Sequence, residues 1–473
     1  MRTCIAAAAV YLLIAGAAPA QSPTAQSTPA SRADSGELRA ARYLDHVRSD
    51  PSLLLEFVRR MPKGGDLHNH LSGAVYAESY LRYAAQDNLC LNRQTLELAQ
   101  ATPAQEPAGG DGHAAAVCDS SKNLVPARQA LSDSVLYRET INAWSMRSFH
   151  ANNESAADHF FDSFRKFGPA TRDHVPEMLA EVVSRAGHEN VQYLELILDP
   201  TKKQPAWRVG VGMGLHDNDF AALRRQLLDK QIDRVVAAAR LDLDDAEKKM
   251  AQILRCGTLD ADPGCDVTVR YIYEVHRALP PDQVFAEMVA GFEMANADPR
   301  IVAVNLVMPE DAYVSMRDFD LHMKMLAYLR IVYPKVRLTL HAGELAPQLV
   351  PPEGLRFHIR ESVEVGHAER IGHGDDIMHE RDPIGLLKEM ARRRVLVEIC
   401  LTSNDLILGL RGAQHPLPMY LRYGVPVALA TDDEGVSRSD LVREFVRAIQ
   451  TYNLKYSDLK RMVRDSAEHS FLP

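Results

Sequence analysis

Two histidines, His68 and His70, stand two residues apart in the segment DLHNHLSG. Residues at this spacing on a β-strand project to the same face, so both imidazoles would point the same way. Imidazole nitrogens bind zinc and related transition metals, which makes the pair a candidate for metal binding. Such pairs also occur by chance on protein surfaces, so the interpretation depends on what stands in similar places elsewhere in the chain.

Three other short apolar segments end in side chains that bind metals or transfer protons. Their candidate residues are His341 and Glu344 in HAGE, His373 in RIGHG, and Asp432 and Asp433 in ATDD. Four of the combined candidates match the ligand set of a catalytic zinc site, because they offer three nitrogens and one oxygen and leave a position for water. Bound Zn²⁺, one per chain, would lower the pKa of that water and supply a hydroxide. The four predicted ligands are His68, His70, His341 and Asp432.

The remaining three candidates could move protons and hold the reactants. Glu344 lies three residues after His341, which suits a general acid that protonates a ring nitrogen before an amine leaves as ammonia. His373 could orient the hydroxide, and Asp433 could accept a hydrogen bond from substrate or water. Alternatively, His373 is a core histidine with satisfied hydrogen bonds, and Asp433 caps a helix predicted over GVSRSDLVREF.

Eight short segments rich in Val, Ile and Leu alternate with longer amphipathic stretches, which is typical of βα units around a parallel sheet. Eight units predict an α/β fold, a closed (β/α)8 barrel of the TIM type with helical and loop insertions after the first strand. The active sites of such barrels lie at the C-terminal ends of the strands, where the candidates stand. The predicted strands cover residues 64–70, 191–198, 267–275, 301–307, 336–342, 370–374, 395–401 and 426–432.

The long connection after the first predicted strand contains two features. Residues 86–130 are predicted to form a loop insertion. In ESAADHFFDSFRKFG, Phe160, Phe164 and Phe167 recur at helical spacing, and Gly168 suits the end of a helix. Such an apolar stripe packs in the core by default, and a lid over the barrel mouth is the alternative.

The N-terminal region predicts export. Residues 1–20 combine an early Arg, an apolar run and a final APA, which is typical of a signal peptide. The apolar run is shorter than the roughly 20 residues needed to span a membrane. We predict a signal peptide over 1–20, a flexible leader over 21–51 and the barrel over 52–473. A periplasmic or secreted location without membrane contact follows.

The cysteines fit an oxidising compartment. Cys90 and Cys118 bracket a segment rich in Ala, Gly and Pro, and Cys256 and Cys265 bracket GTLDADPG, so each pair could close a loop with a disulfide. Cys400 lies in an apolar segment and is predicted to be a buried free thiol. A net charge of −9 with no basic run argues against a nucleic-acid groove and favours a small-molecule ligand.

The order of the motifs resembles the adenosine deaminase family of the amidohydrolase superfamily. The resemblance covers residues 52–472 and includes MPKGGDLHNHLSG, HAGE, RIGHG, EICLTSN, ATDDEGV and the closing YSDLKRMVRDSAEHSFL. It implies zinc on the four predicted ligands and a helical flap over residues 154–168. It also implies that Glu344 protonates purine N1, that His373 orients the hydroxide, and that Asp433 contacts purine N7.

Two positions depart from the family pattern. Ser72 stands where many adenosine deaminases carry an Asp that holds the ribose 5′-hydroxyl. Met308 stands where the family commonly has a Gly close to the purine. Serine is a shorter and weaker partner, and the Met308 side chain would reshape the pocket. We expect both residues to contact the substrate.

The resemblance implies deamination of adenosine and 2′-deoxyadenosine to inosine and ammonia. A deaminase of adenine or of a modified adenine nucleoside or nucleotide is the nearest alternative. The nucleotide version is disfavoured because the motifs have no Gly-rich phosphate loop and no Lys and Arg cluster beside them. Amide or ester hydrolysis on the same scaffold is a third possibility. A non-catalytic exported nucleoside-binding protein is the fourth, and the complete ligand set with Glu344 argues against it.

Overall fold

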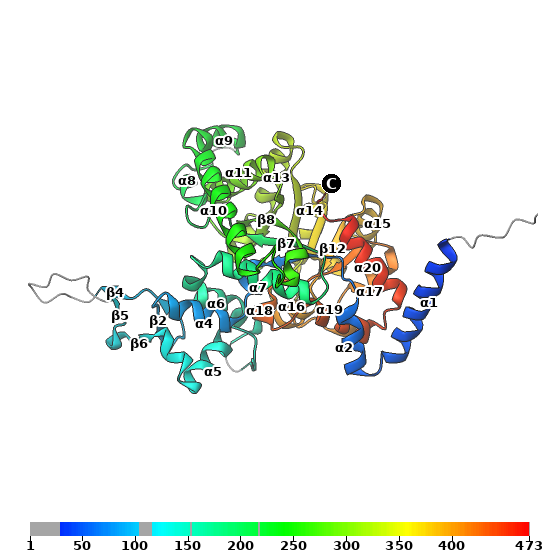
Figure 1. Ribbon diagram of the computed structural model, residues 1–473. Coiled ribbons are helices and arrows are strands. Elements are labelled where there is room, and N and C mark those ends of the chain that lie inside the picture. Colours follow the sequence, from blue (N-terminus) through cyan, green and yellow to red (C-terminus); the bar gives the residue numbers. More distant parts are fainter. Residues whose placement is uncertain (1–28, 104–115, 152–153, 216–217, 473) are drawn as a thin grey trace, which may run out of the picture.

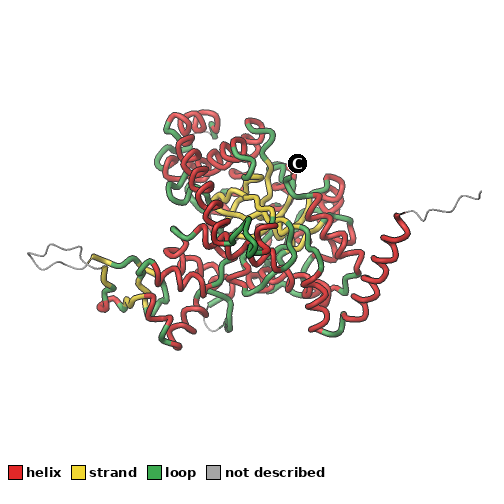
Figure 2. The backbone as a smooth tube through the Cα atoms, in the orientation of Figure 1, coloured by secondary structure: helices red, strands yellow, loops and turns green. Residues whose placement is uncertain are grey.

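Eight parallel strands close into one barrel in the computed structural model, which describes residues 29–103, 116–151, 154–215 and 218–472 (Figures 1 and 2). The first and last strands meet because Asp432 N donates to His68 O at 2.8 Å and His70 N donates to Asp432 O at 3.1 Å. The (β/α)8 prediction is therefore confirmed. The strands are β1 (Gly65–His70), β7 (Tyr193–Leu198), β8 (Thr268–His276), β9 (Ile301–Val307), β10 (Arg337–Ala342), β11 (Arg370–His373), β12 (Leu396–Ile399) and β13 (Val427–Leu429).

Helices surround the barrel and bury its outward-facing apolar side chains in one main core. Seven predicted strands contain an observed strand, and the third, over 267–275, overlaps β8, which extends one residue further. The long amphipathic connections between strands form the helical layer. The helices of this layer and of the connecting loops are α7 (Val175–His188), α8 (Trp207–Gly210), α9 (Phe220–Asp229), α10 (Ile232–Ile253), α11 (Pro281–Ala297), α12 (Tyr313–Arg317), α13 (Phe319–Val332), α14 (His358–Glu364), α15 (Pro383–Arg393), α16 (Leu401–Leu408), α17 (Leu417–Tyr423), α18 (Glu434–Ser437), α19 (Leu441–Tyr452) and α20 (Tyr456–Glu468).

The connection from β1 to β7 forms a separate lobe beside the barrel (Figure 1). The predicted loop over 86–130 contains two small antiparallel sheets, of order β3-β2-β6 and β4-β5, so it is more ordered than the composition indicated. Disulfides join Cys90 to Cys118 in this lobe and Cys256 to Cys265 after α10, as predicted. The elements are α3 (Leu71–Ala74), α4 (Ala77–Gln86), β2 (Cys90–Asn92), β3 (Leu98–Ala99), β4 (Thr102–Pro103), β5 (Ala116–Val117), β6 (Leu124–Pro126), α5 (Ser134–Ala143) and α6 (Ala156–Phe167).

The prediction of a flexible leader over 21–51 is wrong for its second half. Two helices, α1 (Pro29–Val47) and α2 (Pro51–Arg60), precede β1, and α1 contacts α2 and α20. Leu44 and Val47 are three residues apart and fully buried, so an apolar helical face outweighs the polar composition of the segment. The predicted signal peptide lies outside the described residues. Among the described helices, none has the length and apolarity needed to span a membrane.

The centre of the barrel is charged, and its charges are paired. Arg370 of β11 donates to Glu398 of β12 at 2.6 Å and to Glu195 of β7, and all three side chains are fully buried. The guanidinium also lies 4.0 Å from the ring centroid of Phe471, whose backbone N donates to Glu195 at 3.0 Å. The C-terminal residues of the protein therefore contact these charged side chains from the side of the barrel opposite the C-terminal ends of its strands.

Candidate metal centre and active site

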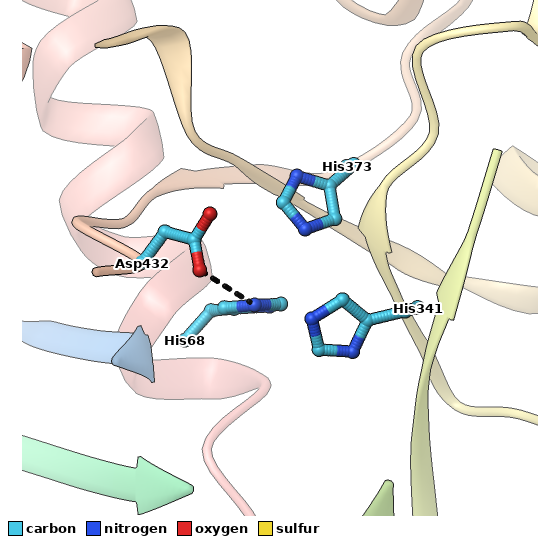
Figure 3. A group of neighbouring side chains, drawn as sticks. All are labelled: His68, His341, His373 and Asp432. Atoms are coloured by element: carbon cyan, nitrogen blue, oxygen red, sulfur yellow. Dashed lines mark ion pairs between the residues drawn. The ribbon is translucent and has the colours of Figure 1, made fainter. Parts of the chain in front are cut away.

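Three imidazoles and one carboxylate meet at the C-terminal ends of the strands (Figure 3). The ring of His68, from β1, has its centroid 4.5 Å from that of His341 and 5.0 Å from that of His373. Asp432 follows β13, and its Oδ1 lies 3.7 Å from His68 Nε2. The ring of His68 can sit here because position 372 is glycine, where a Cβ would lie 2.7 Å from His68 Cε1.

His70 completes the set of predicted ligands. Its Nε2 lies 3.1 Å from His341 Nε2 and 3.5 Å from Asp432 Oδ1. Two ligands of a tetrahedral zinc ion lie about 3.4 Å apart when each bond is about 2.05 Å, so these separations match the edges of such a site. Among the described residues, the buried His68 Nε2 has no hydrogen-bond partner, as expected of an atom that binds a metal. The four residues therefore fit one metal ion.

Hydrogen bonds from outside the cluster orient His68, His341 and Asp432. His68 Nδ1 contacts Glu398 Oε2 at 2.7 Å, and His341 Nδ1 contacts Asn305 Oδ1 at 3.0 Å. A proton on each Nδ1 leaves the Nε2 lone pair for the metal. Ser403 Oγ donates to Asp432 Oδ2.

Charge also favours metal binding at three of the four predicted ligands, whereas the hydrogen bond and charge of Glu398 outweigh burial and raise the pKa of His68. Burial lowers the pKa of His70 to about 3 and that of His341 well below its ordinary value. Neutral imidazoles with free lone pairs are the form that binds metal. Although burial opposes ionisation, the charge that neighbouring imidazoles carry when protonated and the hydrogen bond from Ser403 lower the pKa of Asp432 to about 2, so this carboxylate is charged where His70 and His341 are neutral.

Glu344 lies beside the cluster, and Glu310 holds its backbone. Glu310 accepts hydrogen bonds from Gly343 N at 3.1 Å and Glu344 N at 2.8 Å, which fixes the turn after β10. Glu344 Oε1 lies 3.8 Å from His373 Nε2. Burial and the nearby Asp432 carboxylate raise the pKa of Glu344 well above its ordinary value. A neutral carboxyl group in this position is able to donate a proton.

Asp433 points into the site instead of capping a helix. It precedes α18, but its side chain makes no capping hydrogen bond, and its buried Oδ1 has no partner among the described residues. Position 73 must be glycine here, because a Cβ would lie 1.6 Å from Asp433 Oδ1. Burial and the Asp432 charge raise the pKa of Asp433 well above its ordinary value. The neutral carboxyl is thus available to a ligand.

A cavity of about 390 Å³ opens above the cluster, and both predicted substrate contacts line it. Ser72 follows β1, and Met308 follows β9 with a backbone φ of 84° and a side chain 41% exposed. This left-handed conformation favours glycine, which agrees with the Gly that the resemblance implies for position 308.

The helix α6 forms another wall of this cavity, so its position favours the lid interpretation. Phe160, Phe161 and Phe164 line the cavity. Phe167 instead packs in the core, where its ring stacks on Tyr80 with a centroid separation of 4.5 Å. In the predicted apolar stripe, Phe160 and Phe164 therefore face the site, and Phe167 packs the end of the helix against the core.

Three supporting residues escaped sequence reasoning: Glu398, Asn305 and Ser403. Glu398 and Asn305 are polar residues inside the apolar segments VLVEICL and IVAVNLV. A polar residue flanked by buried apolar residues on a barrel strand is the signal that would have identified both, because such a side chain needs a partner inside the barrel.

Comparison with known proteins agrees with this geometry. The Adenosine deaminase family model matches residues 141–473. An adenosine deaminase of Clostridium perfringens is 34% identical over 136 residues, which are 28% of this chain and 38% of that protein. An adenosine deaminase of Escherichia coli is 35% identical over 138 residues, with the same coverage. The chain thus spans about two fifths of the length of these relatives.

Solved structures share the fold at low sequence identity. Adenine deaminase from Arthrobacter aurescens has a TM-score of 0.53 at 16% identity, covering 87% of this chain and 95% of that one. The N6-mAMP deaminase of Arabidopsis has a TM-score of 0.55 at 19% identity, covering 88% and 96%. The family match begins after β1, so it is the structure that adds His68 and His70 to the site. With most of its length matched by the family model, this chain belongs to the adenosine deaminase family.

Proposed function

We propose that this protein is a zinc-dependent hydrolase that deaminates adenosine and 2′-deoxyadenosine, with one Zn²⁺ per chain and inosine and ammonia as the products from adenosine. The observation that carries the proposal is a buried, neutral Glu344 beside four residues that fit one metal ion, on the wall of a cavity of about 390 Å³. Family membership and relatives named adenosine deaminase support the choice of substrate. The four ligands are His68, His70, His341 and Asp432.

Zinc, when bound, would lower the pKa of water and so supply a nucleophile at neutral pH. The protein's own groups then act on the purine. Glu344 donates the proton of its neutral carboxyl to N1, which makes C6 electrophilic. His373 holds the attacking oxygen, and the neutral Asp433 donates a hydrogen bond to N7. Addition of water at C6 and loss of the exocyclic nitrogen as ammonia convert the aminopurine into the 6-oxopurine.

The apolar side chains of α6 provide a surface that would exclude water from a bound purine ring. Phe161 and Phe164 present aromatic surface to the cavity, and aromatic side chains stack readily on purines. Exclusion of water strengthens the electrostatic effect of the charged groups on the substrate.

Ammonia release from purified, metal-analysed protein tests the proposal. We expect turnover of adenosine and 2′-deoxyadenosine that is lost with a chelator and restored by Zn²⁺. His68→Ala and Asp432→Ala should lose both zinc and turnover. Full zinc occupancy in either variant would contradict the ligand set. A zinc-loaded protein without activity on any aminopurine would instead favour amide or ester hydrolysis or a binding role.

A second candidate substrate class, the aminopurine nucleotides, is favoured by a neighbouring cavity of about 300 Å³. The two cavities share Ser72 and Glu274, and the second is also lined by Lys202 and Arg172. Its other charged lining residues are Lys203, Lys249, Asp173, Asp199, Asp242 and Asp245. Lys202 Nζ contacts Thr171 Oγ1, and neither Lys202 nor Arg172 forms an ion pair with any carboxylate that the structure describes.

The motifs have no Lys and Arg cluster beside them in the sequence, and the fold brings Lys202 and Arg172 to the neighbouring cavity from other parts of the chain. The two basic residues come from separate loops, so they form no run in the sequence. Serine at position 72 also removes a carboxylate that would repel a 5′-phosphate.

The ratio of kcat/KM for AMP to that for adenosine separates the two substrate classes. If nucleotides are the substrates, the ratio exceeds one, and Lys202→Met lowers it by about 10-fold, the value of one charged hydrogen bond. Lys324→Met is the control, because Lys324 is paired with Asp320 and lines neither cavity. A ratio far below one that Lys202→Met leaves unchanged would exclude the nucleotide class.

Export to an oxidising compartment is part of the proposal, supported by the two disulfides. Fractionation of cells that express the full chain, followed by mass spectrometry of the mature N-terminus, tests it. Recovery from the cytoplasm with residues 1–20 attached and four reduced cysteines would contradict export.

A further inference from the structure

Four buried groups form a continuous chain of contacts from β11 to the start of α17. His373 Nδ1 contacts Asn404 Nδ2 at 3.0 Å, and Asn404 Oδ1 contacts His415 Nε2 at 3.1 Å. The backbone N of Leu417 then donates to His415 Nδ1 at 3.1 Å. His373 and Asn404 are fully buried and His415 is 2% exposed, so water does not compete for these contacts.

The backbone amide at the end of the chain fixes the direction of every hydrogen bond. A backbone N–H can only donate, so His415 Nδ1 accepts and carries no proton. The single ring proton of a neutral imidazole must then be on Nε2. His415 therefore donates to Asn404 Oδ1.

The orientation of the Asn404 amide follows. If the amide were turned around, its NH2 group would face His415 Nε2 while Leu417 N–H faced Nδ1. The NH2 group would then face the protonated Nε2, placing two donors 3.1 Å apart. His415 Nε2 also lies 3.2 Å from Asp375 Oδ1, a second buried acceptor that keeps the ring proton on Nε2. With the amide oxygen on His415, Asn404 Nδ2 donates to His373 Nδ1, and this nitrogen is an acceptor.

We propose that Asn404 and His415 are positioning residues that hold His373 in the tautomer with its proton on Nε2. His373 Nε2 is buried among the site residues without a hydrogen-bond partner in the described parts of the chain, and it lies 3.8 Å from Glu344 Oε1. A nitrogen that carries a proton donates a hydrogen bond to the attacking oxygen and does not bind metal.

This tautomer decides which histidine completes the metal site. Ligand atoms of His373 lie within 4.8 Å of those of His68, His341 and Asp432, so distance alone would admit His373 as a ligand. The proton on Nε2 removes it from the ligand set and leaves that place to His70. The effect on turnover rests on the proposed function, whereas the tautomer is a property of the folded protein alone.

Nitrogen-15 NMR of the zinc-loaded, histidine-labelled protein tests the tautomer directly. The His373 signals, identified from the spectrum of His373→Gln, should show an unprotonated Nδ1 and a protonated Nε2. A proton on Nδ1 would overturn the proposal whether or not the protein deaminates anything. A protein with the expected tautomer but no deaminase activity would contradict only the proposed function.

Asn404→Asp reverses the direction of the hydrogen bond to His373, while the side chain keeps nearly the same shape. A carboxylate accepts from both histidines, so His373 should move its proton to Nδ1. We expect kcat to fall about 10- to 100-fold, the usual effect of losing an orienting partner, with little change in KM and unchanged zinc content. Asp405→Asn is the matched control in α16, because Asp405 pairs with Arg447 and Arg411 and takes no part in the hydrogen bonds that link His415, Asn404 and His373. Equal activity in Asn404→Asp and the control would overturn the proposal.

Two substitutions of His415 separate hydrogen bonding from packing. His415→Gln retains an N–H donor for Asn404 Oδ1, whereas His415→Leu keeps similar volume without a donor. We expect His415→Gln to keep the His373 tautomer and most of the turnover, and His415→Leu to lose both. Equal kcat in two folded, zinc-loaded variants would show that His415 only fills space and would overturn its assigned role.

Discussion

Two buried polar layers inside the barrel differ in how completely their hydrogen bonds are satisfied. In the central layer, Glu195 accepts from Tyr193 at 2.8 Å, from Phe471 N and from Arg370, and Glu398 accepts from Arg370, Thr339 and His68. At the strand ends, the equally buried His68 Nε2, His373 Nε2 and Asp433 Oδ1 have no partners among the described residues. Burial alone therefore does not distinguish the two layers, whereas unsatisfied buried atoms do, since those at the strand ends are free to bind a metal or a substrate. Such atoms also occur elsewhere, for example on His322 and Asp376, so they identify the site only together with the ligand geometry.

Glu398 joins the two layers. One of its oxygens accepts from Arg370 in the centre and the other contacts His68 in the metal cluster. The charge of Arg370 and the hydrogen bond from His68 outweigh burial and lower the pKa of Glu398, so it stays ionised. The paired layer thus provides a rigid, negatively charged support for one metal ligand.

The largest effect on turnover is expected from a change to Glu344, at the C-terminal ends of the strands, that keeps the size of the side chain. Glu344→Gln removes the acidic proton but keeps size and burial, so kcat should fall by about 10²- to 10⁴-fold. Zinc content and thermal midpoint should stay close to those of the original protein. Ammonia release under saturating adenosine measures the effect, and turnover close to the original rate would exclude Glu344 as the proton donor.

The largest effect on stability is expected in the central layer. Arg370→Met leaves the buried carboxylates of Glu195 and Glu398 without their cation, which should lower the free energy of unfolding by about 3–5 kcal/mol. Urea unfolding of the zinc-loaded protein measures it. Arg464→Met is the control, because Arg464 pairs with Glu468 at the surface and should have no measurable effect. If both variants unfold alike, the central charges do not support the barrel as described.

A smaller and more selective effect is expected at Ser72, on the cavity wall. Ser72→Asp supplies a carboxylate near the predicted place of the ribose 5′-hydroxyl, so kcat/KM for adenosine relative to adenine should rise by about 10-fold, the value of one charged hydrogen bond. Zinc content should not change. An unchanged ratio would show that position 72 does not face the ribose.

The barrel and the metal cluster could be predicted from sequence because their signals are local. Each strand is a short run of Val, Ile and Leu, and a closed barrel places the residues that end those strands around one point. His341 and His373 therefore come together although 32 positions separate them in the chain.

Unlike Glu398 and Asn305, whose polar side chains interrupt apolar strands, other contacts could not be predicted, because they join residues with no common local pattern. Asn404 and His415 act on His373 from other elements, and Lys202 and Arg172 meet from separate loops. The helix α1 was missed for another reason, since composition described its polar face and not the buried pair Leu44 and Val47.

The smallest expected effect concerns His276 and Glu287 at the cavity rim. These two side chains are hydrogen-bonded to each other, whereas the neighbouring metal ligand His68 has a nitrogen without a partner among the described residues. His276 Nδ1 lies 3.1 Å from Glu287 Oε1. Although burial opposes protonation, the hydrogen bond and charge of Glu287 raise the pKa of His276 from 6.5 to about 9. A pKa raised on folding means that protonated His276 stabilises the native state. This contribution is complete below pH 6.5 and is lost as the pH rises through 9.

His276→Gln tests this pair through the pH dependence of stability. We expect the variant to be less stable than the original protein by about 1 kcal/mol at pH 6, the scale of a partly exposed ion pair. The difference should shrink above pH 9, because both proteins are then neutral at this position. Thermal unfolding across that range with zinc present measures the difference. A stability difference that stays constant with pH would assign the effect to packing of the His276 side chain. The charge of the His276–Glu287 pair would then contribute nothing to stability.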